Sequence, residues 1–149
     1  ATIIEKLFKI FNPDNAYFGE KDFQQLLLIK TLTEQLDIKT NVVGCETIRE
    51  ADGLAMSSRN KLMSDKERKS AKEIIKLLLW AKEVYSKFDF IQIRDEIKNR
   101  SKLIDSFKLE YFEIMNLEEF SSISKKNNET RAFMACRIGN IRLIDNIKL

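Results

Sequence analysis

The chain has 149 residues, with 26 Lys or Arg, 23 Asp or Glu, two Cys and no His, which excludes a Ser-His-Asp triad, a Cys-His pair and a Cys/His zinc site. The net charge of +3 comes from intermixed acidic and basic residues, and no apolar run approaches the roughly 20 residues that cross a membrane, so we expect neither a nucleic-acid nor a membrane partner. Two cysteines are too few for a disulfide scaffold, which favours a cytoplasmic location.

The first third of the chain has the pattern of a parallel α/β domain. Residues 1–11 have apolar side chains at helical spacing, but neither a Met nor a capping residue precedes them, so we expect the chain to begin inside a larger fold. A short buried strand over 16–19, a helix over 22–37 and a strand over 41–45 follow. A strand, a helix and a strand within about 30 residues predict one βαβ unit with parallel strands.

Past residue 47 the pattern changes, and we expect a small α+β domain. Residues 48–60 are polar and contain Gly53, which is typical of a connector or a site loop. Ser64 and Glu67 have the spacing of a capping box, which marks the start of a helix. In chain order we expect a helix over 64–87, a second helix over 91–103, a half-buried strand over 107–111, a polar loop over 116–129, and a hairpin with strands over 131–138 and 141–145.

The first candidate site runs from Gly19 to Asp22, directly after the first predicted strand. In open α/β sheets, ligands bind beyond the carboxyl ends of the strands, where helix N-termini present backbone N–H groups. Gly19 would let a ligand approach the backbone, and Lys21 adds a cation, so this corner suits an anionic ligand. A purely structural alternative stays open, because Asp22 and Gln25 also have the spacing of a capping box.

The second candidate site is the segment 52–60. Ser57, Ser58 and Arg59 supply two hydroxyls and a guanidinium on consecutive residues, and these donors match the needs of a polyphosphate. Gly53 would act as a hinge of this loop. The alternative is an ordinary polar turn before a helix, where Ser and Asn are common. Together with the corner at Gly19, the segment favours phosphate binding.

Other polar or reactive residues point to structural roles. Cys45 and Cys136 lie in apolar strand patterns, which predicts unreactive core thiols. Arg137 and Arg142 flank the predicted hairpin turn, where cross-strand pairing explains them without a ligand. Lys125 and its neighbour in the predicted 116–129 loop are expected to be solvated surface residues.

Three segments together carry a family resemblance. They are P-D-N-A-Y-F-G-E-K-D-F-Q-Q-L at 13–26, T-I-R-E-A-D-G-L-A-M-S-S-R-N at 47–60 and R-I-G-N-I-R-L-I-D-N at 137–146. In this order they resemble the pantothenate synthetase (pantoate–β-alanine ligase) family. The match covers what looks like the C-terminal half of the enzyme, without the N-terminal half and its H-x-G-H motif. We therefore expect a fragment that is inactive on its own.

The resemblance implies a fold and a domain division. The fold would be the last βαβ part of a Rossmann-like, nucleotidyltransferase-type parallel sheet, followed by a small α+β domain with helices and an antiparallel sheet. Residues 1–47 would belong to the nucleotide-binding domain, 48–60 to a hinge and phosphate-binding loop, and 61–149 to the C-terminal domain.

The resemblance also implies a reaction in two steps. The pantoate carboxylate attacks the α-phosphorus of ATP, with Mg²⁺ assisting, to give pantoyl adenylate and pyrophosphate; the amine of β-alanine then displaces AMP. Such an attack needs positioning and charge neutralisation by the protein. Lys21 with Ser57, Ser58 and Arg59 would stabilise the phosphates. The ATP site implied by the family pattern consists of Gly19, Glu20, Lys21, Asp22, Ile48, Met56, Ser57, Ser58 and Arg59.

Further roles and alternatives follow from the same resemblance. Gln25 would hydrogen-bond pantoate, which competes with its possible capping role, and Ile48 would contact adenine through its backbone. A homodimer formed through the missing N-terminal domain is implied. The alternative from another class is a non-catalytic or truncated nucleotide-binding module. Another adenylyltransferase of the superfamily is disfavoured, because Gln25 and the 47–60 segment match together.

Overall fold

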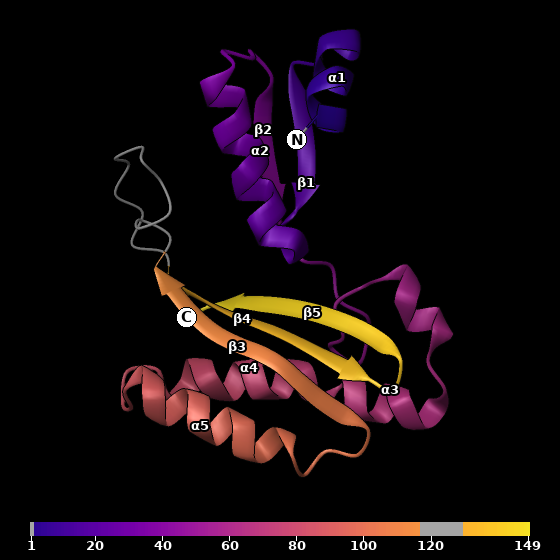
Figure 1. Ribbon diagram of the computed structural model, residues 1–149, viewed down its shortest axis with the longest axis vertical. Helices are drawn as coiled ribbons and strands as arrows, with labels where there is room; N and C mark the ends of the chain where they lie inside the picture. The colour runs from indigo at the N-terminus through magenta and orange to yellow at the C-terminus, as the bar shows by residue number, and fades with distance from the viewer. Residues whose placement is uncertain (1, 117–129) are drawn as a thin grey trace. The chain divides into compact units, whose positions relative to one another are not determined.

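The structure of the chain is a computed structural model that describes residues 2–116 and 130–149 (Figure 1). The chain divides into two compact units, Ala1–Thr47 and Ile48–Leu149. Each unit has its own sheet, a parallel one in the first unit and an antiparallel one in the second. The mixed α/β fold class expected from the sequence is confirmed. Among the described residues, no helix has the length and apolar character that crossing a membrane requires.

The first unit is a βαβ unit preceded by a helix. Its two strands are parallel, with register partners from Asn15 with Asn41 to Gly19 with Cys45. This pairing confirms the parallel unit predicted from the strand–helix–strand pattern. The elements in chain order are α1 (Thr2–Phe11), β1 (Asn15–Gly19), the 3₁₀ turn η1 (Glu20–Asp22), α2 (Phe23–Gln35) and β2 (Asn41–Cys45).

Both helices of this unit pack on one face of the two-stranded sheet. Phe18 and Gly44 are register partners and therefore point to the same side. The ring of Phe8 in α1 lies edge-on to Phe18 with 6.5 Å between centroids, and Leu26 of α2 lies against Gly44, where a Cβ would come within 3.0 Å of its Cδ2 atom. The absent side chain at Gly44 thus lets α2 approach the sheet.

The expectation that β1 is buried is wrong for this chain. Tyr17, which points to the opposite side from Phe18, is 69% exposed. Cys45 at the end of β2 is also exposed, so the prediction of a core thiol fails there. The reason is the same for both residues: α1 and α2 cover one face of the sheet, and the described part of the first unit has no further helix to cover the other.

The second unit is a three-stranded antiparallel sheet in the order β3-β4-β5, with α4 and α5 against one face (Figure 1). β4 is central, and it turns into β5 at Gly139 and Asn140, which confirms the predicted hairpin. The elements in chain order are η2 (Ser58–Leu62), α3 (Asp65–Ala71), α4 (Glu73–Val84), α5 (Phe90–Ser101), β3 (Phe107–Asn116), β4 (Thr130–Ile138) and β5 (Ile141–Lys148).

The core of this unit lies between the helices and the sheet. Leu78 of α4, Ile93 and Ile97 of α5, and Met134 and Cys136 of β4 all have at most 1% of their surface exposed. Burial raises the pKa of the Cys136 thiol to about 12, so this cysteine is a protonated core residue, as the sequence predicted.

Two predicted elements differ clearly in extent from the observed ones, and a third lies almost wholly outside the described residues. The helix expected over 64–87 is two helices, α3 and α4, which meet at Lys72, a residue whose backbone stays in the right-handed helical region with ψ of −21°. The strand expected over 107–111 continues to Asn116, because β4 pairs with it along its whole length. Of the loop expected over 116–129, all but its first residue lies outside the described residues, as does Lys125.

The start of α3 and the β4–β5 turn share one carboxylate. Ser64 and Glu67 form the predicted capping box: the Glu67 carboxylate accepts from the Ser64 backbone N–H at 2.8 Å and from the Ser64 hydroxyl at 2.7 Å. Gly139 has φ of +55°, and a Cβ at this position would collide with Glu67 Oε1. The backbone conformation of this turn therefore favours glycine, and any side chain there would also displace the Glu67 carboxylate.

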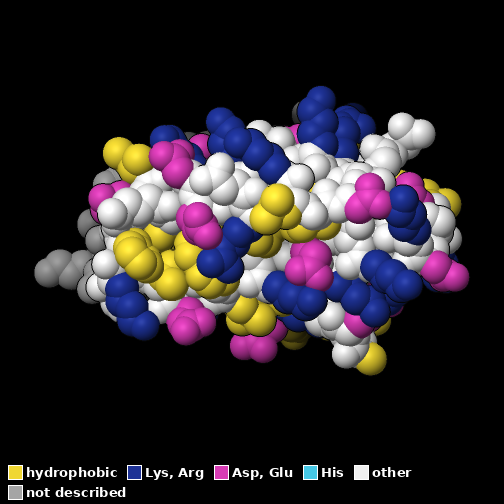
Figure 2. All heavy atoms as spheres, turned by 90° about the horizontal axis from the view of Figure 1, so that it is seen from below, with side chains coloured by type: hydrophobic (Ala, Val, Ile, Leu, Met, Phe, Trp, Pro, Cys, Tyr) yellow, Lys and Arg dark blue, Asp and Glu magenta, His cyan; other side chains and the backbone are white. Residues whose placement is uncertain are grey.

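The outer face of the sheet carries the two arginines beside the turn. Arg137 and Arg142 are register partners, and both donate through Nε to Glu110 of β3, at 2.9 and 2.7 Å. The Arg142 guanidinium, and then that of Arg137, lowers the pKa of the Glu110 carboxyl. Cross-strand pairing therefore explains both arginines. On the face of α4 and α5 shown in Figure 2, basic side chains likewise lie beside acidic ones.

Candidate functional site

The first group of predicted site residues lies at the carboxyl edge of the parallel sheet. β1 ends at Gly19 and β2 ends at its register partner Cys45, so both strands stop at the same level. The 3₁₀ turn η1 follows β1 directly and leads into α2. Glu20 and Lys21 in this turn are half-buried, whereas Asp22 is exposed. This edge is where parallel sheets bind ligands, in front of a helix that begins there.

Gly19 is not required by the chain's own packing. Its φ of −68° and ψ of 132° are open to any residue, and a Cβ built on it would meet no atom within 4 Å. Gly44 on the neighbouring strand differs, because a Cβ there would press on Leu26 and Glu20. The space beside Gly19 is open, which is the condition for a ligand to approach the backbone of the corner.

The capping box that Asp22 and Gln25 could have formed is absent. Asp22 precedes α2, but with φ of −94° and ψ of 55° its side chain makes no capping hydrogen bond. The N-caps Ser64 and Asp89, which do form boxes, have extended backbones with ψ of 163° and 165°. Asp22 is the last residue of the 3₁₀ turn η1, which keeps its backbone out of this conformation. The structural alternative for the Asp22–Gln25 spacing is therefore wrong.

Gln25 lies on the exposed side of α2, in its first turn. It also lines a hollow of about 260 Å³ between α1 and α2, whose walls include the apolar side chains of Ile4, Leu28 and Leu32. The structure thus places Gln25 both beside the corner and at this hollow.

The second group of predicted residues belongs to a tight, hydrogen-bonded loop at the start of the second unit. The backbone N–H of Met56 donates to the carbonyl of Ile48 at 2.9 Å, and that of Glu50 donates to the carbonyl of Leu54 at 2.8 Å. Leu54 and Ala55 are each 3% exposed and anchor the loop to the unit. Ile48 and Met56, eight residues apart, therefore lie side by side.

Gly53 is the turn residue of this loop. Its φ is +86°, and a Cβ there would come within 3.2 Å of Ile75. Its N–H donates to the carbonyl of Glu50 at 2.8 Å, and its own carbonyl accepts from Arg49 Nη1 at 3.1 Å. A hinge role for Gly53 stays a prediction; what the structure shows is a fixed turn that only glycine adopts readily.

Beyond Ala55 the chain runs along the exposed surface of the unit. Met56 is 56% exposed, and Ser58 and Arg59 are exposed at the first turn of η2. The Ser57 hydroxyl caps this 3₁₀ helix by accepting from the Arg59 N–H at 3.3 Å. Its O–H remains a donor, so the segment presents two hydroxyl donors and a guanidinium together.

A network of charged side chains connects the loop to α3. Arg68 of α3 donates through Nη2 to Glu50 at 2.6 Å and to Asp52 at 2.8 Å. Hydrogen bonds from Asn60, and then from Arg68, lower the pKa of the Glu50 carboxyl. Burial opposes ionisation of Asp52, but the Leu54 N–H and Arg68 together still lower its pKa. Both carboxylates are therefore ionised at neutral pH and bind the helix to the loop.

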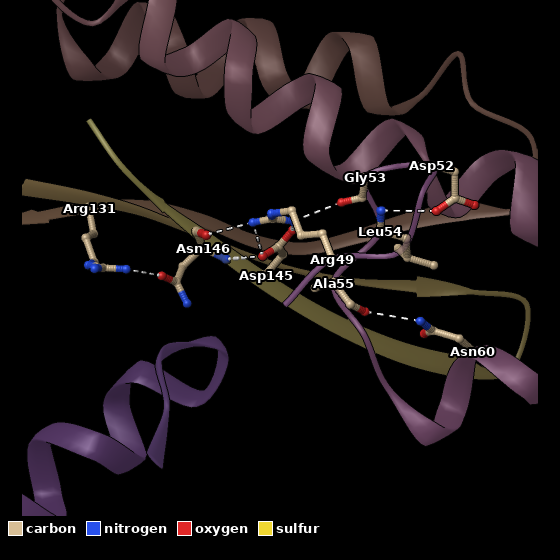
Figure 3. A network of polar contacts seen from close by, with 9 residues as sticks. All are labelled: Arg49, Asp52, Gly53, Leu54, Ala55, Asn60, Arg131, Asp145 and Asn146. Carbon is tan, nitrogen blue, oxygen red and sulfur yellow. Dashed lines mark hydrogen bonds and ion pairs between the residues drawn. The ribbon is translucent and has the colours of Figure 1, made fainter. Parts of the chain in front are cut away.

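An ion pair with a buried carboxylate also holds this loop, and sequence reasoning gave it no role. Arg49 donates to both carboxylate oxygens of Asp145 in β5, at 2.7 and 3.0 Å (Figure 3). The Asp145 side chain is 2% exposed. The available signal was that Arg49 and Asp145 stand in two of the three matching segments, 47–60 and 137–146, which the ion pair joins.

Within each unit, the predicted site residues are neighbours. Gly19, Glu20, Lys21 and Asp22 are consecutive at the corner, with Gln25 in the next helical turn. Ile48 and Met56 are paired, with Ser57, Ser58 and Arg59 directly following. The first group offers backbone N–H groups, an ammonium and an amide, and the second offers hydroxyls and a guanidinium. Both sets suit a ligand with several anionic oxygens.

Comparison with known proteins identifies relatives over nearly the whole chain. The family model for pantoate-beta-alanine ligase matches residues 1–148. Pantothenate synthetase from Sulfurihydrogenibium sp. (strain YO3AOP1) is 45% identical, with 99% of this chain and 54% of the relative covered. The pantothenate synthetase of Flavobacterium psychrophilum is 42% identical, with 99% and 53% covered. The chain thus spans about half the length of the curated relatives it matches.

Solved structures agree with these relatives. The crystal structure of pantothenate synthetase from Thermus thermophilus is 34% identical, with a TM-score of 0.87, and the match covers 99% of this chain and 54% of that one. A pantoate-beta-alanine ligase from Francisella tularensis, crystallised with beta-gamma ATP and beta-alanine, is also 34% identical, with a TM-score of 0.67 and 99% and 48% covered.

Proposed function

Because the chain belongs to the pantoate-beta-alanine ligase family, we propose that it supplies part of the site at which ATP drives the ligation of pantoate and β-alanine. The reaction proceeds through a pantoyl adenylate, with pyrophosphate released in the first step and AMP in the second. Since the chain spans about half the length of its relatives, the ligation also requires residues beyond these 149. The chain alone is expected to be inactive.

The observation that carries this proposal is the corner from Gly19 to Gln25. Its glycine has open space beside it, and its acidic residue leaves the helix start uncapped. Packing in the first unit does not call for a glycine here, and its helix is not capped by Asp22, so both features leave space and a polar group for a ligand at the carboxyl edge of the sheet. The Francisella tularensis relative, whose structure contains beta-gamma ATP, supports a nucleotide as that ligand.

In the first unit we assign roles by the chemistry of each group. Lys21 binds phosphate oxygens and neutralises charge that develops on them in the adenylation step. Gly19 and Asp22 lie near the ribose, where the Asp22 carboxylate accepts from a hydroxyl, and Glu20 completes this wall. Gln25, which no capping box engages, hydrogen-bonds pantoate and orients its carboxylate for attack.

In the second unit the loop supplies the remaining contacts. The backbone of Ile48 contacts adenine, and Met56 lies next to it through their hydrogen bond. Ser57 and Ser58 donate hydroxyl protons to phosphate oxygens, and Arg59 adds a guanidinium that binds two oxygens at once. Ser57, Ser58 and Arg59 act on the phosphates as positioning and charge-stabilising groups, so no covalent bond to the protein is needed.

Mg²⁺ belongs to the proposal as the companion of ATP, since it neutralises phosphate charge. The described residues contain no group of three or more His, Cys, Asp and Glu that could hold a metal ion.

Pyrophosphate release by protein of the relatives' full length tests this function. Release should require both ATP and pantoate, and AMP and pantothenate should appear only after β-alanine is added. Pyrophosphate release without pantoate would contradict the proposal. Binding of ATP without any release under all conditions would favour the alternative, a nucleotide-binding module without catalysis.

The family relationship also leads us to propose a cytoplasmic homodimer, formed through the part of the relatives that this chain does not span. Light scattering on the full-length protein and on the 149-residue chain tests this assembly. The full-length protein should have twice its monomer mass, whereas the 149-residue chain should be monomeric. A monomeric full-length protein would contradict the proposal.

A further inference from the structure

The segment Met56–Arg59, called the excursion below, is a four-residue, largely exposed stretch between two buried residues. Ala55 on one side is 3% exposed, and Asn60 on the other is 5% exposed. These anchors are joined directly, because Asn60 Nδ2 donates to the carbonyl of Ala55 at 3.1 Å (Figure 3). The same amide donates to Glu50, which Arg68 holds in turn. The four residues of the excursion therefore leave and re-enter the unit at one fixed point.

Arg49 fixes the other strand of the loop to the sheet. Its guanidinium forms a fork with both oxygens of Asp145, and it also donates to the carbonyls of Gly53 at 3.1 Å and Asn146 at 3.4 Å. Arg49 and Ala55 are bridge partners across the loop. Through these bonds Arg49 contacts the tip of the loop, its returning strand and β5.

The Arg49–Asp145 pair is hard to rearrange, because the Asp145 carboxylate is buried. It pairs across the sheet with Met134, which is 1% exposed, and its carboxylate also accepts from the N–H of Asn146 at 2.8 Å. A carboxylate that loses its close counter-charge in such surroundings is strongly destabilised. The planar fork also fixes direction, which a point charge does not. Asp145 thus holds Arg49, and hence the loop, in one orientation.

We propose that Arg49 and Asn60 are positioning residues of the ligation site: with Asp145 and Ala55 as their partners, they hold Met56–Arg59 in the geometry in which it meets the phosphates of ATP. This inference rests on the proposed function, and neither residue touches the substrate. Arg49 ties the loop to β5, and Asn60 joins the two ends of the segment Met56–Arg59. The loss of the Arg49–Asp145 pair or of the Asn60–Ala55 hydrogen bond therefore lets the hydroxyls and the guanidinium of Ser57, Ser58 and Arg59 shift together.

The test uses full-length protein and the initial rate of pyrophosphate release. Arg49→Lys keeps the charge but removes the fork, Asp145→Asn keeps the shape but removes the charge, and Asn60→Ser opens the excursion. Each should lower kcat/KM for ATP by about 10- to 100-fold, the size expected for a displacement near 1 Å. Rates are measured at a temperature at which circular dichroism shows every variant folded. Arg142→Lys, which alters an arginine–carboxylate pair elsewhere in the same sheet, is the matched control and should keep the parent's kinetics.

A double-mutant cycle separates positioning from stability. If Arg49 and Asp145 act only through each other, the double variant should lose no more kcat/KM than the worse single variant. Folded variants with the parent's kcat and KM would overturn the inference, as would failure of both Arg49→Lys and Asn60→Ser to fold, since the bonds would then serve stability alone. A parent protein that releases no pyrophosphate would instead contradict the proposed function.

Discussion

The corner at Gly19 and the loop at Arg49 use similar polar residues in opposite ways. At the corner, Asp22 makes no capping bond and the space beside Gly19 is open. In the loop, Arg49 and Asn60 each bond to two or more partners. The difference teaches that residues proposed to bind a ligand and residues that fix the backbone can be different sets: Asp22 caps no helix, whereas Arg49 and Asn60 are hydrogen-bonded within their own unit.

Replacement of Lys21 should have the largest effect of all on catalysis. Lys21→Ala in the full-length protein is expected to slow pyrophosphate release by about 100- to 1,000-fold, or about 3 to 4 kcal/mol in barrier, because one charge-stabilising donor is lost. Lys30→Ala, on the exposed surface of α2, is the control. Equal rates of pyrophosphate release in the two variants would contradict a role of this corner in ATP binding.

Truncation of Arg49 should have the largest effect on stability. Arg49→Ala leaves the 2%-exposed Asp145 carboxylate without its fork, and we expect a loss of about 3 kcal/mol in the free energy of unfolding. Urea denaturation measures it. Arg142→Ala breaks a more exposed pair and should cost much less. An equal loss of unfolding free energy in both variants would show that the Arg49–Asp145 pair stabilises the protein no more than the exposed Arg142 pair.

Substitutions at the two N-cap positions, Ser64 and Asp22, should have different effects on stability. Ser64→Ala removes an observed capping box and should destabilise the protein by about 1 kcal/mol. Asp22→Ala removes no cap and should change stability by less than about 0.5 kcal/mol, while weakening ATP binding. Thermal unfolding and nucleotide titration provide the two readouts, and a stability loss at Asp22 as large as that at Ser64 would refute the distinction.

The smallest expected effect concerns pH. The pKa of Glu50 is lowered in the folded state, so its stabilisation is present above the ordinary glutamate pKa of 4.5 and is lost as pH falls through the lowered value. Glu50→Gln should therefore be less stable than the parent at pH 7, and the difference should shrink below about pH 4. A difference in unfolding midpoint that stays constant from about pH 7 to about pH 3 would mean that charge is not the cause.

Much of the fold could be predicted because its signals are local. The βαβ unit follows from apolar runs at strand and helix spacing, the start of α3 follows from Ser64 and Glu67, and the hairpin follows from Gly139 and Asn140. The break at Lys72 and the full length of β3 could not be predicted, because they depend on how the helices and β4 pack in three dimensions.

The two groups of candidate site residues could be named from the sequence, but the contacts that fix their backbone could not. The Asp22–Gln25 spacing cannot reveal whether a cap forms, since the answer depends on the 3₁₀ turn that sets the backbone of Asp22. The partner of Arg49 lies 96 residues away in β5, a distance over which spacing carries no information. The prediction that Cys45 is buried was wrong for a similar reason, because its burial depends on which face of the sheet the helices cover.

The carboxylate of Glu67, shared between the start of α3 and the turn at Gly139, couples two positions that are far apart in the sequence. Any side chain at position 139 would displace this carboxylate and so weaken the half of the capping box in which Glu67 accepts from Ser64, at the start of a helix that begins at Asp65. The energetic effects of Gly139→Ala and Ser64→Ala should then overlap instead of adding. Natural variants that lose Gly139 would be expected to change Glu67 as well, which makes the pair a place to look for correlated substitution among relatives.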